Sequence, residues 1–101
     1  MRVIVFFDLP TETGEDKRNY RKFRKYLIKS GFMMLQESVY AKLALNYTQV
    51  DQVITEVKKS KPPKGSVQIL SVTEKQFSKM EHISGKSSTN IINTDERLLI
   101  L

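Results

Sequence analysis

Hydrophobic and polar positions along the chain switch between strand-type and helix-type spacing. The first apolar run covers residues 3–7 and is followed by Asp8 and by Leu9-Pro10. Five consecutive β-branched or aromatic residues occupy both faces of a strand, which is typical of a central strand. Because proline donates no hydrogen bond within a sheet, the strand is expected to end near Asp8.

A helix is predicted from about residue 14 to Gly31. Thr13 and Asp16 have the spacing of a capping box, and Gly31 suits the left-handed conformation that ends many helices. The apolar stripe of this helix, at spacings of three and four, consists of Tyr20, Phe23 and Leu27.

Two strands are expected next, over residues 32–36 and 38–45, joined by a hairpin around Gln36-Glu37. A second helix should begin after Asn46 or Thr48 and end before the two prolines at 62–63. Its apolar stripe is Val50, Val53, Ile54 and Val57. A fourth strand is predicted over residues 66–73, and Glu74 to Met80 has the pattern of a short helical turn.

The order strand, helix, strand, strand, helix, strand indicates an α+β protein with a ferredoxin-like βαββαβ antiparallel sheet and two helices on one face. We expect this domain to cover residues 1–80. The uncovered sheet face also carries apolar residues, so a second copy of the chain should cover it, giving a homodimer packed through the sheets.

The remainder of the chain is predicted to be a polar linker at residues 81–96 followed by an apolar strand at 97–101. This fifth strand should pair with the sheet of its own subunit or of the partner. Its residues are Arg97, Leu98, Leu99, Ile100 and Leu101.

Composition narrows the functional classes. The chain has no cysteine, so disulfides, thiolate metal sites and cysteine nucleophiles are excluded. The apolar run at residues 3–7 is too short for a signal-peptide core, and no run approaches the length of a membrane span. A cytoplasmic protein with no membrane contact is the expectation.

Positive charge is concentrated in two segments. Of 17 Lys and Arg, which outweigh 11 Asp and Glu, seven lie in residues 17–29 and four in residues 58–64. Such clustering favours a polyanion partner, and nucleic acid is the expected one, although a solvated helix face remains the alternative. The candidate phosphate contacts are Arg18, Arg21, Lys22, Lys25, Lys61 and Lys64.

Asp8 is the candidate for chemistry, because the chain contains no phosphate loop, paired histidines or nucleophile elbow. One carboxylate alone binds Mg²⁺ or Mn²⁺ weakly. If two first strands met across a two-fold axis, two copies of Asp8 could share one ion and act on a phosphodiester. The alternative is that Asp8 is a turn residue that accepts backbone hydrogen bonds.

Four segments together resemble the CRISPR-associated protein 2 family. They are Phe7-Asp8-Leu9-Pro10, the basic helix at Tyr20 to Leu27, the hairpin Gln36 to Tyr40, and Val72 to Phe77. The resemblance covers essentially the whole chain and is closest to members that accompany type II-A systems. It implies a homodimer of ferredoxin-like subunits, placed between dimers of the CRISPR integrase subunit on double-stranded DNA. It also implies that Asp8 matches a metal-binding aspartate and that Arg97 to Leu101 matches a strand that pairs with a neighbouring sheet.

Three functions follow as hypotheses. The favoured one is a nucleic-acid-binding scaffold in spacer acquisition, which uses the two basic clusters. The second is a Mg²⁺- or Mn²⁺-dependent endonuclease centred on Asp8, acting on RNA or DNA. The third and weakest is a ferredoxin-like regulatory domain, which leaves the basic helix unexplained.

Overall fold

The computed structural model describes residues 1–85. Its elements follow the predicted order closely, and each boundary falls within two or three residues of the expectation. They are β1 (Arg2–Asp8), α1 (Gly14–Lys29), β2 (Met33–Gln36), β3 (Val39–Leu43), α2 (Tyr47–Lys59), β4 (Ser66–Val72) and α3 (Glu74–Ser78). The predicted strand at 97–101 and nearly all of the predicted linker at 81–96 lie outside the described residues.

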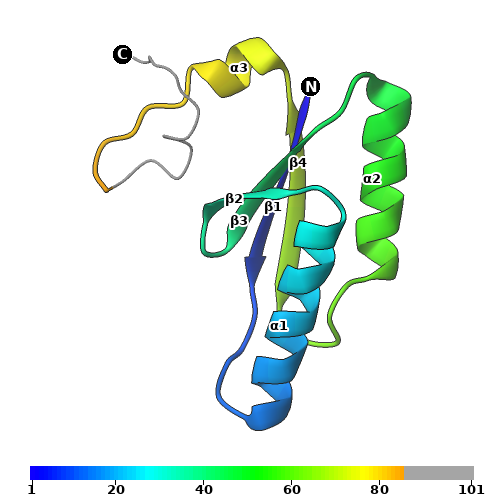
Figure 1. Cartoon of the computed structure of the whole chain (residues 1–101), viewed down its shortest axis with the longest axis vertical. Helices are drawn as coiled ribbons and strands as arrows, with labels where there is room; N and C mark the ends of the chain where they lie inside the picture. Colours follow the sequence, from blue (N-terminus) through cyan, green and yellow to red (C-terminus); the bar gives the residue numbers. More distant parts are fainter. Residues whose placement is uncertain (86–101) are drawn as a thin grey trace.

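The four strands form one antiparallel sheet in the order β2-β3-β1-β4. β1 is central, as its apolar run predicted, and β2 and β4 are the edge strands of the sheet formed by residues 1–85. With α1 and α2 packed on one side of the sheet, this is the predicted ferredoxin-like arrangement (Figure 1). The α+β fold class is therefore confirmed for this part of the chain.

The helix ends are fixed by the residues that the sequence singled out. The Thr13 side chain accepts a hydrogen bond from the Asp16 backbone N–H, and the Asp16 carboxylate accepts one from the Thr13 backbone N–H. Gly31 follows α1 with φ of 96°, a conformation that favours glycine. Asn46, one of the two predicted candidates, caps α2 by accepting from the Gln49 backbone N–H.

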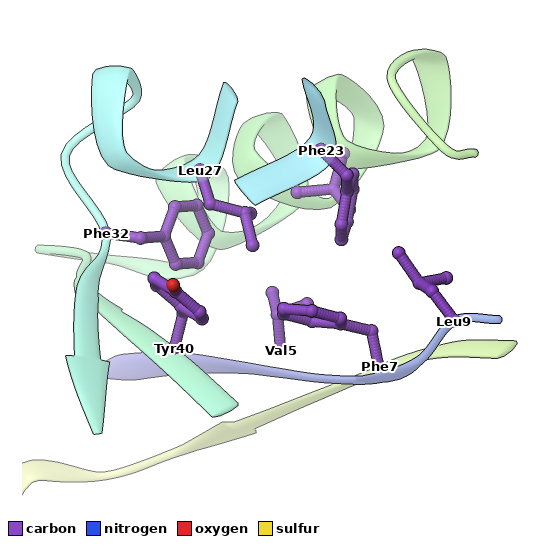
Figure 2. Close-up of a cluster of buried hydrophobic side chains, with 8 residues drawn as sticks. Val5, Phe7, Leu9, Phe23, Leu27, Phe32 and Tyr40 are labelled. Carbon is purple, nitrogen blue, oxygen red and sulfur yellow. The ribbon is translucent and has the colours of Figure 1, made fainter. Parts of the chain in front are cut away.

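The main hydrophobic core lies between α1 and the sheet (Figure 2). Val3, Val5 and Phe7 of β1 alternate towards the helices and are almost fully buried. The Phe7 ring packs edge-on against Phe23, with centroids 5.3 Å apart, and is stacked with Tyr40 at 5.7 Å. Both geometries are favourable for aromatic rings. This contact between α1, β1 and β3 holds the basic helix to the sheet.

Within residues 1–85, no helix crosses the centre of the opposite sheet face, which we call the open face. Strand alternation and the pairing register place on it Arg2, Ile4, Phe6 and Asp8 of β1 and their cross-strand partners. Large apolar side chains are exposed here: Phe6 at 37%, Leu70 at 53% and Leu43 at 50%. Several exposed apolar side chains on one sheet face are typical of an interaction face.

The short helix α3 covers the Arg2 end of β1. Its N-terminus is closed by a capping box between Thr73 and Gln76. The Arg2 guanidinium donates to the Glu74 carboxylate at 2.8 Å and lies 4.7 Å from the centroid of the Phe77 ring. The second contact is a cation–π interaction, and together the two attach α3 to the central strand. No helix within residues 1–85 has the length and apolarity needed to cross a membrane.

Candidate nucleic-acid and metal sites

The four basic residues predicted on the first helix lie on its solvent side. Arg18, Arg21, Lys22 and Lys25 are all exposed, while Phe23 and Leu27 of the same helix are buried. None of these four bases forms an ion pair with a carboxylate belonging to residues 1–85. Their charge is therefore not neutralised inside this part of the molecule, which is the condition for a phosphate-binding surface.

Lys61 and Lys64 are exposed in the loop between α2 and β4. This loop lies against the end of β1, because a Cβ atom on Gly65 would be only 2.7 Å from the Asp8 carbonyl oxygen. Figure 1 shows the loop and the first half of α1 towards the same end of the molecule. The fold thus brings the loop at residues 61–64 and the early part of the first basic segment, which are about 40 positions apart in the sequence, towards one end of the sheet.

Asp8 is the last residue of β1, is exposed and lies on the open face opposite Ser66. Its carboxylate accepts no hydrogen bond from the described part of the chain, so the interpretation of Asp8 as a turn residue gains no support. Asp8 is free to bind a ligand from outside the subunit.

The residues of one subunit do not fit a Mg²⁺ or Mn²⁺ ion by themselves. No group of three or more His, Asp or Glu side chains that could hold a metal exists within residues 1–85. A hard divalent cation requires several oxygen ligands and usually more than one carboxylate. Any such site at Asp8 therefore needs further oxygen ligands from outside the subunit, and a second copy of Asp8, as in the sequence-based hypothesis of a shared ion, is one source of them.

Sequence reasoning missed the role of Arg24, which belongs to the basic segment at residues 17–29 but is not among the predicted phosphate contacts. Arg24 Nε donates a hydrogen bond of 2.8 Å to the Tyr40 hydroxyl group of β3. Tyr40 is fully buried. Arg24 therefore satisfies the polar end of a core side chain. The available signal was the position of Arg24 between Tyr20 and Leu27, at helical spacings that place it beside the packed stripe.

Gly65 was also missed as a structural requirement. Its φ is 94°, and a side chain there would clash with Asp8 and Leu9. The sequence contains a hint, because glycine directly after Pro62-Pro63-Lys64 is typical of a turn, but the close approach to Asp8 depends on the sheet register.

Fold and surface together define a ferredoxin-like α+β protein with an exposed cationic helix on one side and an open apolar sheet face on the other. Comparison with known families matches residues 1–80 to the family described as CRISPR associated protein Cas2. The chain belongs to the CRISPR-associated Cas2 family, as the resemblance of its motifs indicated.

Individual relatives support the assignment over the full length. A Treponema denticola protein named CRISPR-associated endoribonuclease Cas2 is 60% identical over 101 residues, covering all of both chains. A Streptococcus mutans protein of the same name is 48% identical and matches all of this chain and 93% of its own. The crystal structure of Streptococcus pyogenes Cas2 at pH 6.5 superposes with a TM-score of 0.63 over 83% of this chain and all of its own. At 20% identity, that likeness supports the fold alone.

Proposed function

We propose that this chain is the small nucleic-acid-binding subunit of a CRISPR spacer-acquisition complex, working as a homodimer that bridges integrase dimers on double-stranded DNA. Membership of the Cas2 family places it in a CRISPR system. The observation that carries the proposal is the exposed basic face of α1, whose charges have no acidic partner within residues 1–85.

The proposed contacts are to phosphates and do not read base sequence. Lysine and arginine side chains on the outside of a helix, without an element that enters a groove, match backbone positioning. Neutralising phosphates releases counterions, so the affinity should fall steeply as salt rises. The phosphate contacts would come from Arg18, Arg21, Lys22, Lys25, Lys61 and Lys64.

Charge reversal at Arg18 and Lys22 tests this surface. The double variant Arg18→Glu, Lys22→Glu should bind a labelled DNA duplex roughly tenfold more weakly at low salt, with a log–log salt slope smaller by roughly two. The matched control is Lys75→Glu, Lys79→Glu, at α3, which makes the same change in net charge away from the basic clusters. Equal binding by the two double variants would contradict the proposal.

The open face is the proposed dimer interface. Leu70 lies in it with half of its surface exposed. Leu70→Glu should therefore leave the core of one subunit intact while placing a charge in the interface. Analytical ultracentrifugation should then find monomers where the unchanged chain is a dimer. When the monomeric variant is mixed with the CRISPR integrase subunit and duplex DNA, it should fail to join two integrase dimers. If Leu70→Glu still forms a dimer, the open face is not the dimer interface.

A second candidate function is a metal-dependent endonuclease, and two observations favour it. Relatives at 60% and 48% identity are named endoribonucleases. Asp8 also lies on the open face, so packing two open faces together would place two Asp8 carboxylates in one interface. Such a pair would be suited to one shared Mg²⁺ or Mn²⁺ ion, which would stabilise negative charge developing on a phosphodiester.

Substitution of the carboxylate tests the endonuclease. Asp8→Asn should abolish Mg²⁺- or Mn²⁺-dependent cleavage of RNA and DNA probes while leaving the dimer and duplex binding unchanged. Asp51→Asn, which changes an exposed carboxylate of α2, is the matched control. Cleavage that persists in Asp8→Asn would remove Asp8 from any nuclease site.

A further inference from the structure

A groove with both polar and apolar walls, the apolar ones including Leu9 and Met34, lies between α1 and the β2–β3 hairpin. Its walls include Tyr20, Arg21 and Arg24 of α1 and Glu37 and Ser38 of the hairpin. The groove has a volume of about 780 Å³ and opens to solvent. An open groove with two guanidinium groups is suited to part of a large anionic ligand, whereas small apolar ligands are usually enclosed on most sides.

Both walls of this groove are fixed by hydrogen bonds between elements. The Tyr20 hydroxyl group donates to the Glu37 carbonyl oxygen at 3.3 Å, which joins α1 to the hairpin. Arg24 Nε donates to the hydroxyl group of the fully buried Tyr40. A guanidinium group held at Nε has lost much of its rotational freedom before any ligand arrives, so less entropy is lost on binding.

Most hydrogen-bond donors of the two arginines remain available. A guanidinium has five N–H groups, and the bond to Tyr40 uses one of those on Arg24. The remaining four of Arg24, and all five of Arg21, have no acceptor within the described part of the chain. Two planar donor groups of this kind match the oxygen geometry of a phosphodiester anion.

We infer that this groove binds one backbone phosphate of a nucleic acid, with Arg24 as the pre-positioned donor and Arg21 as the second cation. The inference deepens the proposed function and rests on it. Within the basic surface of α1, this groove would be a site where the position of one guanidinium group is fixed by a hydrogen bond. The shared chemistry is the phosphodiester anion, and either DNA or RNA can supply it.

The hydrogen bond to Tyr40 has an alternative explanation, namely that Arg24 only satisfies a buried hydroxyl group. The conservative variant Arg24→Lys separates the two. It keeps the positive charge but loses the planar fork and the Nε donor. A general basic surface predicts unchanged affinity for nucleic acid, whereas the phosphate site predicts a loss of about tenfold, corresponding to one charge-assisted hydrogen bond.

The experiment measures binding of labelled duplex DNA and duplex RNA of equal length, by anisotropy, to the full chain and its variants. We expect a loss of about tenfold for Arg24→Lys and of several-fold for Tyr40→Phe, which keeps the ring that packs on Phe7. Lys75→Gln on α3 is the control and should bind like the unchanged chain. The nucleic acid that shows the loss identifies the source of the phosphate.

A spectroscopic readout separates ligand contact from a purely structural role. In ¹⁵N-edited spectra, the Arg24 Nε–H signal should shift on addition of duplex, both in the unchanged chain and in Lys75→Gln. Thermal melting confirms that each variant is folded before its binding is compared.

The outcomes separate this inference from the proposed function. If the unchanged chain binds duplex with a steep salt dependence but Arg24→Lys binds equally well and the Nε–H signal does not move, the phosphate site is wrong and the basic surface stands. If the unchanged chain binds neither DNA nor RNA at low salt, both are wrong. A loss in Arg24→Lys together with a shifted Nε–H signal supports the site.

Discussion

The two faces of the sheet are built from the same strands, yet they differ in what covers them. On the helix-covered face, Val5 and Phe7 are 0% and 5% exposed, whereas Phe6, which lies between them in β1, is 37% exposed on the open face. The covered face is complete within one subunit. On the open face, the apolar side chains of Phe6, Leu43 and Leu70 and the Asp8 carboxylate are exposed to solvent.

This difference indicates which properties belong to the single chain and which need a second molecule. Stability should depend on the covered face, because its side chains lose their contact with water on folding. Assembly and any chemistry at Asp8 should depend on the open face, whose exposed apolar side chains, Phe6, Leu43 and Leu70, gain little until something covers them. Four predictions test this division, beginning with the largest expected effect.

Truncation of the Phe23 side chain should destabilise the packing of α1 on the covered face of the sheet. Phe23 is almost fully buried and packs against Phe7. Phe23→Ala should therefore lower the free energy of unfolding by about 3–5 kcal/mol. Chemical denaturation followed by circular dichroism measures this change. A loss below about 1 kcal/mol would mean that the packing of α1 on the sheet does not hold the domain together.

Gly65 lies in the loop between α2 and β4 and packs against Asp8, the last residue of β1. A side chain there would meet the Asp8 carbonyl oxygen, and the backbone is in the left-handed region. Gly65→Ala should therefore cost roughly 2–4 kcal/mol, from backbone strain and from this contact. Gly14→Ala is the control, because a Cβ atom there meets nothing within 4 Å and lies in a helix. Equal stability of the two variants would contradict the close approach of the loop.

Neighbouring residues of β4 give the sharpest test of the two faces. Ile69 packs against the core and Leu70 is 53% exposed on the open face. In the monomer, Ile69→Ala should cost about 1–3 kcal/mol and Leu70→Ala less than about 0.5 kcal/mol. Denaturation at protein concentrations below the dimer dissociation constant measures both, and a larger cost for Leu70 would reverse the assignment of faces.

Removing the ion pair that attaches α3 to β1 should have the smallest effect on the free energy of unfolding. The ion pair between Arg2 and Glu74 is partly exposed to solvent. Glu74→Gln should therefore change the free energy of unfolding by less than about 1 kcal/mol. Hydrogen exchange should nevertheless become faster in α3 and not in α1. Unchanged exchange in α3 would mean that the ion pair does not attach it.

Sequence patterns predicted the elements and the topology of residues 1–85 because those depend on local spacing. The central position of β1, the capping box at Thr13 and the turn at Gly31 all follow from adjacent residue types. The bond between Arg24 and Tyr40 and the approach of Gly65 to Asp8 join segments that are distant in sequence. Neither could be predicted before the strand register was known.

For the candidate sites, the sequence predicted which side chains are exposed but not how they are arranged. The exposure of Arg18, Lys22 and Lys25 follows from helical periodicity. Strand alternation predicts that Asp8 and Phe6 share a sheet face. Whether other metal-binding side chains lie near Asp8 depends on how distant segments fold, and within residues 1–85 no group of three or more such side chains is present. The metal and dimer predictions concern two chains and stay predictions, as does the fifth strand.

The hydrogen bond between Arg24 and Tyr40 also affects how the molecule responds to mechanical load. Tyr40 is anchored in the middle of the sheet by its ring contact with Phe7, so a pull on the Arg24 guanidinium is passed directly to the rigid central strands. Lysine side chains that project from the helix surface would instead bend under the same pull. A phosphate bound at Arg24 would therefore pass its load to the central strands through this one hydrogen bond.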